Sequence, residues 1–142
     1  MQDLPEAILW TDGAARGNPG PAAAGVVLKT PEGEVLLTEN EYLGETTNNV
    51  AEYRALLLGL TLALERGIQR IEVRADSELL IKQLLGKYRV QSPHLIELHR
   101  QARELLQRFA ASKLVHVRRE YNAEADYQAN LAIKQNLRAS RS

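Results

Sequence analysis

Two spacings of hydrophobic residues alternate along this chain. In the first third, short apolar runs are separated by turn residues, such as Asp12-Gly13 and Pro31 to Gly33, and this arrangement predicts strands joined by tight connections. From Asn48 to Arg66 the apolar positions recur at helical spacing, and Gly67 follows as a stop. The whole pattern predicts strands at residues 7–11, 22–29, 34–42, 68–75 and 113–118, and helices at 48–66, 77–85, 93–110 and 123–137.

The order of these elements describes a mixed α/β sheet with helices packed on it. Three successive strands joined by turns are expected to form an antiparallel meander. A chain of 142 residues suits one domain, which would remove roughly two thirds of its unfolded surface from water. We expect that domain to span residues 1–137, with residues 138–142 as a disordered tail because they have nothing to bury.

Composition narrows the chemistry and the location. The chain has no cysteine, so a metal ion would need oxygen or histidine ligands. The N-terminus lacks the basic start and apolar run of a signal peptide, and no stretch approaches the ~20 apolar residues that span a bilayer. We therefore expect a cytoplasmic protein with no membrane partner and, because no exposed apolar stripe is evident, a monomer.

The charges balance overall but are unevenly distributed. Residues 1–65 carry 10 acids and 3 bases, whereas residues 84–119 carry 8 bases and 2 acids. Such segregation can place an acidic site beside a basic surface. The alternative, that both segments are simply solvated faces, stays open at this point.

Glu52 is the most informative of the acidic residues. The residues that share its face of the expected helix are all apolar or small, namely Ala55, Leu56, Gly59, Leu60 and Ala63. A carboxylate that points inward among them needs a cation or a hydrogen-bond network, because an unpaired buried charge costs several kcal/mol. The alternative is a buried ion pair with an arginine.

Three aspartates stand at comparable places. Asp12 and Asp76 each follow an alternating strand, and Asp126 lies in the first turn of the last helix with Asn130 and Ile133 on its face. The alternatives are an Asp-Gly turn for Asp12, a helix N-cap for Asp76 and a helix-dipole interaction for Asp126. Ligands of α/β folds gather beyond the carboxyl ends of strands, so Asp12 and Asp76 become neighbours if their strands are parallel and adjacent.

Four stretches that contain these acids resemble the ribonuclease H type 1 family. They come in the family's order, span nearly the whole chain and together are highly specific: residues 11–25, TDGAARGNPGPAAAG; residues 46–57, TTNNVAEYRALL; residues 75–83, ADSELLIKQ; and residues 122–130, NAEADYQAN. The resemblance implies a ribonuclease H-like fold, with a five-stranded mixed sheet flanked by helices. The first three strands would be antiparallel, and strands one, four and five parallel.

The resemblance also implies the chemistry. Asp12, Glu52, Asp76 and Asp126 would be catalytic and would bind two Mg²⁺ ions, with Mn²⁺ as a substitute and Asp12 bridging the pair. The expected activity is two-metal endonucleolytic hydrolysis of the RNA strand of RNA–DNA hybrids, leaving 5′-phosphates. Two alternatives stay open. The first is a catalytically inactive nucleic-acid-binding module of the same fold, and the second is a nuclease of broader specificity that also cleaves double-stranded RNA.

Substrate contacts are expected beside the acids. Residues that match the family's readers of the 2′-hydroxyl are Asn18, Asn48, Asn49 and Ser77. The alternative for Asn18 is a role as a turn residue before proline. The alternative for Asn48 and Asn49 is helix capping.

The chain departs from many family members in two places. Many members carry a basic protrusion between the second and third helices, and here the segment from Gly86 to Pro93 is too short to form it. Binding of the hybrid should therefore be weaker or more salt-sensitive. The loop before the last helix has no histidine, and Arg118 or Arg119 is expected to supply positive charge there, Arg118 in catalysis and Arg119 in substrate binding.

Overall fold

The fold is one five-stranded sheet with helices on both faces. A computed structural model describes residues 4–141. The strands are β1 (Ala7–Ala15), β2 (Gly20–Lys29), β3 (Val35–Thr46), β4 (Arg70–Ala75) and β5 (Ala111–His116). The helices are α1 (Asn48–Glu65), α2 (Glu78–Leu84), α3 (Pro93–Gln107), a short 3₁₀ turn η1 (Arg119–Tyr121) and α4 (Ala123–Arg141).

The strand order is β3-β2-β1-β4-β5. β1, β2 and β3 pair antiparallel, whereas β4 pairs parallel with both β1 and β5. The predicted fold class is therefore confirmed. Thr11 of β1 lies opposite Ala75 of β4, so the residues that follow them, Asp12 and Asp76, are neighbours.

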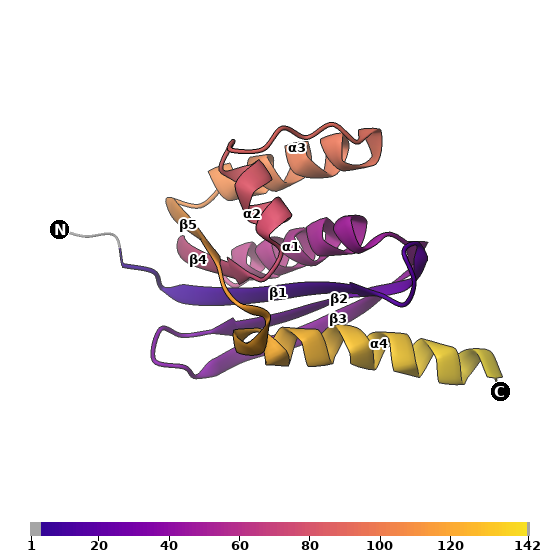
Figure 1. The fold of residues 1–142 in the computed structure, drawn as a ribbon. Coiled ribbons are helices and arrows are strands. Elements are labelled where there is room, and N and C mark those ends of the chain that lie inside the picture. The colour runs from indigo at the N-terminus through magenta and orange to yellow at the C-terminus, as the bar shows by residue number, and fades with distance from the viewer. Residues whose placement is uncertain (1–3, 142) are drawn as a thin grey trace.

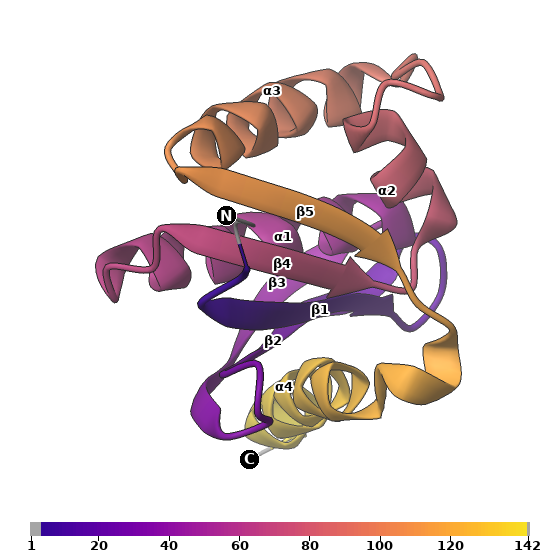
Figure 2. The ribbon, with the colours of Figure 1, turned by 90° about the vertical axis from the view of Figure 1, so that its left-hand side faces the viewer.

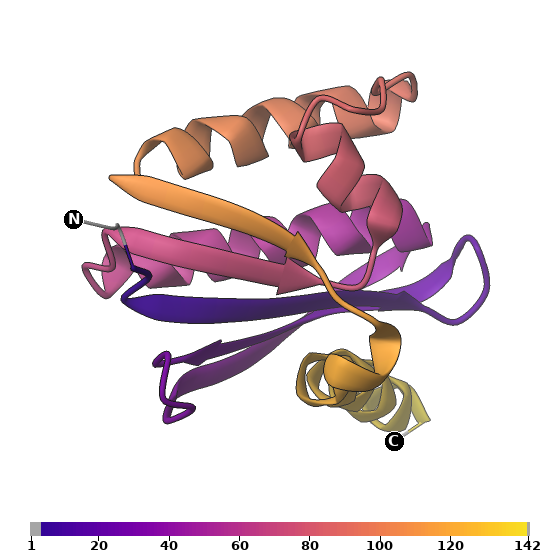
Figure 3. The same ribbon diagram turned by 60° about the vertical axis from the view of Figure 1, so that its left-hand side comes forward.

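The helices form two layers. α1, α2 and α3 lie on one side of the sheet and α4 lies on the other (Figure 1, Figure 2). The main hydrophobic core fills the space between the sheet and the α1–α3 layer, with Leu9, Tyr53 and Leu60 among its fully buried members. A smaller cluster around Ala23, Ala132 and Ile133 lies beneath α4. The chain changes sides after β5, where η1 leads past the end of the sheet into α4 (Figure 3).

Two glycines allow helices to approach the middle of the sheet. A Cβ added at Gly13 would lie 2.2 Å from the backbone carbon of Ala51 in α1. A Cβ added at Gly25, the partner of Asp12 across β1 and β2, would lie 2.2 Å from the carbonyl oxygen of Ala125 in α4. A larger residue at Gly13 would push α1 away from β1, and a larger residue at Gly25 would push α4 away from β2, the neighbour of the strand that carries Asp12.

Several element boundaries differ from those predicted. β1 continues through Asp12 to Ala15 rather than ending at Thr11, because its ladder with β2 continues to the pair Ala15 and Ala22. α4 continues to Arg141 rather than ending at about Leu137, so residues 138–141, expected as a tail, are helical in this structure. Leu137, at the predicted end of the helix, packs against the cluster beneath α4. Ser142 lies outside the described residues.

Smaller shifts occur at the other ends. β2 begins two residues earlier than predicted and β3 runs on to Thr46, whereas β5 lies two residues earlier than expected and α3 ends at Gln107. Within residues 4–141, no helix combines the length and the apolar character that crossing a bilayer requires.

Candidate active site

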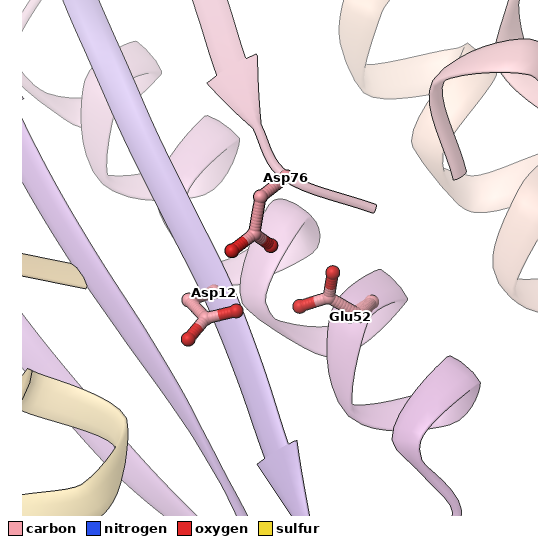
Figure 4. A group of neighbouring side chains, drawn as sticks. All are labelled: Asp12, Glu52 and Asp76. Carbon is pink, nitrogen blue, oxygen red and sulfur yellow. The ribbon is translucent and has the colours of Figure 1, made fainter. Parts of the chain in front are cut away.

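Three of the four predicted carboxylates converge. Asp12 comes from β1, Glu52 from the second turn of α1 and Asp76 from the end of β4, and one oxygen of each lies within 4.8 Å of the others. Figure 4 shows the three carboxyl groups pointing toward a common space. Parallel pairing of β1 with β4 brings the aspartates together, and the inward face of α1 supplies the glutamate.

The cluster is buried and electrostatically strained. Asp12 is 6% exposed and Glu52 7% exposed. Burial, followed by the charge of Glu52 and a hydrogen bond with Asp126, raises the pKa of Asp12 far above its ordinary value. Burial also raises the pKa of Glu52, although the N–H of Gly13, which donates to Oε1 of Glu52, and the charge of Arg119 oppose the rise. The metal-free cluster therefore retains protons that a cation would displace.

Asp126 reaches the same cavity from the opposite layer. It lies in the first turn of α4, close enough to Asp12 to help raise the pKa of that group. It falls outside the group of three whose oxygens lie within 4.8 Å. The helix-dipole interaction expected as its alternative is compatible with this position, because a first-turn carboxylate faces the positive end of the helix.

The alternatives for the other acids fare differently. Asp12 lies within the β1 ladder opposite Gly25, so the Asp-Gly turn is wrong. The hydroxyl of Ser77 caps α2 by accepting from the N–H of Leu80 at 3.2 Å, so the N-cap role for Asp76 is wrong. Glu52 takes part in none of the ion pairs formed within residues 4–141.

The carboxylates line a cavity of about 400 Å³ whose walls are mostly polar. Four acids and one arginine, Arg119 of η1, line the cavity. The positive charge of Arg119 therefore opposes the rise in the pKa of Glu52. The lining residues are Asp12, Gly13, Ala14, Ala15, Asn48, Asn49, Glu52, Asp76, Ser77, Arg119, Asp126 and Asn130.

The other predicted site residues, five for substrate binding and Arg118 for catalysis, divide into two groups. Asn48, Asn49, Ser77 and Arg119 line the cavity, whereas Asn18 and Arg118 do not. Oδ1 of Asn18 accepts from the backbone N–H of Asn48 at 3.1 Å, so Asn18 supports the start of α1. Arg118 is exposed, with its guanidinium 3.7 Å from Glu120.

Helix capping does not explain the two asparagines of α1. The residue that caps α1 is Thr47, whose hydroxyl accepts from the N–H of Val50 at 3.2 Å. Asn48 and Asn49 are exposed at the rim, where their amides remain available to a ligand.

Two further asparagines were not predicted as site residues. Asn130 lines the cavity one turn after Asp126, and its shared helical face was the available signal. Asn122 is 1% exposed, and its Nδ2 donates to the carbonyl oxygen of Thr11 at 2.8 Å, which ties the start of α4 to the residue before Asp12. A bond between segments so far apart in sequence leaves no local signal.

The donor set fits a hard divalent cation. The cavity offers carboxylate, amide and hydroxyl oxygens, which are the ligands that Mg²⁺ and Mn²⁺ prefer. Asp12, Glu52 and Asp76 could hold one such ion together, and Asp12 with Asp126 could hold another.

Comparison with known proteins agrees with this geometry. The reverse transcriptase-like family matches residues 10–132. Ribonuclease HI of Halobacterium salinarum is 44% identical over 124 residues, which are 87% of this chain and 62% of that protein, so the chain spans less than two thirds of this relative's length.

Solved structures match over nearly their whole length. The crystal structure of the Halobacterium salinarum RNase H1 has a TM-score of 0.89 and 42% identity, covering 91% of this chain and 98% of the other. LC11-RNase H1 in complex with an RNA/DNA hybrid has a TM-score of 0.88 and 42% identity, covering 92% and 99%. With its sheet topology and the placement of its acids, the chain belongs to the ribonuclease H type 1 family within the reverse transcriptase-like proteins.

Proposed function

We propose that this protein is a metal-dependent endoribonuclease that cleaves the RNA strand of RNA–DNA hybrids and leaves 5′-phosphates. The observation that carries the proposal is the convergence of Asp12, Glu52 and Asp76 within 4.8 Å at an open polar cavity. The similar LC11-RNase H1, which has been solved with an RNA/DNA hybrid, supports the substrate class.

The acids are proposed to hold two Mg²⁺ ions, with Mn²⁺ as a substitute. Asp12, Glu52 and Asp76 would hold the first and Asp12 with Asp126 the second. When bound, such ions supply Lewis-acid chemistry to the phosphodiester. The protein's own contribution is to present the oxygens from rigid elements, because Asp12 is set within a strand and Glu52 within a helix.

Neighbouring polar groups are proposed to read the ribose. Asn48 and Asn49 stand at the cavity's rim on α1, and an amide can donate to and accept from a 2′-hydroxyl at once. Ser77 also lines the cavity, and Asn18 acts through the backbone of Asn48.

Arg119 is the arginine that we assign to the site. It lines the cavity and lies close enough to act electrostatically on Glu52, so it can contact a phosphate of the bound strand. Arg118 is exposed, pairs with Glu120 and does not line the cavity, so we assign it no catalytic role. Arg119→Ala should slow cleavage at saturating Mg²⁺, whereas Arg118→Ala should leave it nearly unchanged.

We further propose that the chain acts as a monomer. Among the described residues, the exposed large apolar side chains come from separate elements, such as Val35 of β3, Ile96 of α3 and Tyr127 of α4. Sedimentation at micromolar concentration should give the mass of one chain.

The test of function is cleavage of a labelled RNA–DNA hybrid, compared with double-stranded RNA and double-stranded DNA, with Mg²⁺ or with a chelator. We expect Mg²⁺-dependent cutting of the hybrid's RNA strand and no cutting by Asp12→Asn. Binding of the hybrid without cutting would support an inactive binding module instead. Equal cutting of double-stranded RNA would support the broader nuclease.

A further inference from the structure

Asn130 makes two hydrogen bonds back to Asp126. Its Nδ2 donates to the main-chain oxygen of Asp126 at 3.0 Å and to Oδ1 of the same residue at 3.2 Å. The first bond is ordinary for a polar side chain four residues along a helix. The second reaches the carboxylate itself, at the wall of the cavity that both residues line.

The Asp126 carboxylate is therefore held by a donor on its own helix. The Asn130 amide donates to it from the next turn of α4, and Asp12 on β1 lies close enough for the two carboxyl groups to interact. An aspartate side chain has few rotatable bonds, so a donor fixed at Oδ1 restricts the rotamer and leaves Oδ2 without a bond to Asn130. Groups that orient a ligand in this way commonly change metal affinity by about 10–100-fold.

The backbone beneath Asp126 is already fixed by other contacts. Asn122 ties the start of α4 to Thr11, and the absence of a side chain at Gly25 lets α4 lie against β2. What these contacts leave free is the rotation of the Asp126 side chain. Asn130 is the described residue whose hydrogen bond restrains it from within α4.

We propose that Asn130 is a positioning residue that orients the Asp126 carboxylate and thereby sets the affinity of the second divalent cation. The inference rests on the proposed metal site at Asp12 and Asp126. It acts through Asp126 alone, so it predicts no loss of contact with the nucleic acid.

Asn130→Ser gives the sharpest test. A serine hydroxyl can keep the bond to the main-chain oxygen of Asp126 but is too short to reach its carboxylate. Titration calorimetry with Mg²⁺ and with Mn²⁺ should show the weaker of the two ions bound about 10-fold less tightly than in the wild type. Asn130→Ala should show the same change, and Gln135→Ala, at an exposed position of α4, should show none.

Kinetics and a double variant separate positioning from direct contact. The Mg²⁺ concentration for half-maximal cleavage should rise about 10-fold, with the KM for the hybrid unchanged. In an Asp126→Asn background, Asn130→Ser should have no further effect on metal binding, because the residue on which it acts has been altered. A raised KM with an unchanged metal requirement, or a full additional effect in that background, would overturn the inference.

The outcomes also separate this inference from the proposed function. If the wild type binds Mg²⁺ but does not cleave the hybrid, the nuclease proposal fails, and calorimetry still decides the role of Asn130. If the wild type cleaves and Asn130→Ser keeps its metal affinity, only the inference fails. Thermal unfolding in chelator must match that of Gln135→Ala for either variant to count as folded; Asn130→Ser, which keeps the backbone bond, serves if the alanine variant does not fold.

Discussion

At the scale of single residues, the site is a balance between burial and repulsion. Asp12 and Glu52 are almost fully buried and face one another with Asp76 within 4.8 Å. Burial is the main cause that raises the pKa of both groups; the charge of Glu52 adds to the rise at Asp12, and the charge of Asp76 adds to the rise at Glu52. Their ionised forms are therefore disfavoured until a cation arrives. The same features that prepare the site for metal make it costly when empty.

The empty site should therefore lose stability as pH rises. A carboxyl group whose pKa is raised in the folded state stabilises the protein fully below its unfolded pKa, near 4, and that contribution is lost as pH rises through the folded value. Saturating Mg²⁺ should remove the loss, so the free energies of unfolding with Mg²⁺ and with chelator should diverge as pH rises from 5 to 9. Urea unfolding at several pH values measures this gap.

Asp12→Asn provides the control for that experiment. Removing the most strongly shifted carboxyl group should stabilise the metal-free protein at pH 7 by about 1–3 kcal/mol, because one pKa unit corresponds to about 1.4 kcal/mol. It should also flatten the dependence of chelator-treated protein on pH. A variant less stable than the wild type in chelator would contradict the assigned strain.

At the scale of elements, the site depends on how closely the two helical layers approach β1. Gly13 lies against α1 at Ala51 and Glu52, and its N–H donates to the Glu52 carboxylate. Gly25 lies against α4 at Ala125. These contacts bring Glu52 and Asp126 to Asp12 from opposite sides of the sheet.

Gly13→Ala should separate α1 from β1. The added Cβ would lie 2.2 Å from the backbone of Ala51, where no flexible side chain can yield, so we expect a loss of stability of about 3 kcal/mol together with much weaker Mg²⁺ binding. Gly33→Ala is the matched control, because its Cβ meets nothing within 4 Å and its positive φ alone should cost about 1–2 kcal/mol. Calorimetry should show normal Mg²⁺ affinity for Gly33→Ala only.

At the scale of the whole molecule, acidic and basic segments occupy different parts of the fold. Residues 1–65, where acids outnumber bases, contain β1, β2, β3 and α1. Residues 84–119, where bases outnumber acids, contain α3, β5 and the start of η1. Lys87 and Arg89 are exposed in the short connection between α2 and α3. With zero net charge, attraction to a nucleic acid backbone must come from such local cations.

Hybrid binding should therefore depend on few phosphate contacts. The double variant Lys87→Ala and Arg89→Ala should lower the slope of log affinity against log salt concentration by up to about 2, because each lost phosphate contact removes about one unit. Arg66→Ala, at the far end of α1 from the cavity, should leave the slope unchanged. Binding measured by fluorescence anisotropy in chelator keeps the substrate intact, and an unchanged slope in the double variant would show that these cations are only solvated.

The sequence by itself determined the types and order of the elements, the inward face of Glu52 and the likeness of the four acidic stretches to a known family. Those features are local, because a helical period or a motif is complete within 15 residues or fewer. Only the tertiary structure decided that β1 continues through Asp12, that Ser77 rather than Asp76 caps α2, and that Arg119 rather than Arg118 faces the acids. The contacts of Asn122 and Asn130 likewise emerged only there. A strand's end is set by its partner strand and a cavity's wall by elements far apart in sequence, so neither is written in any single stretch of the chain.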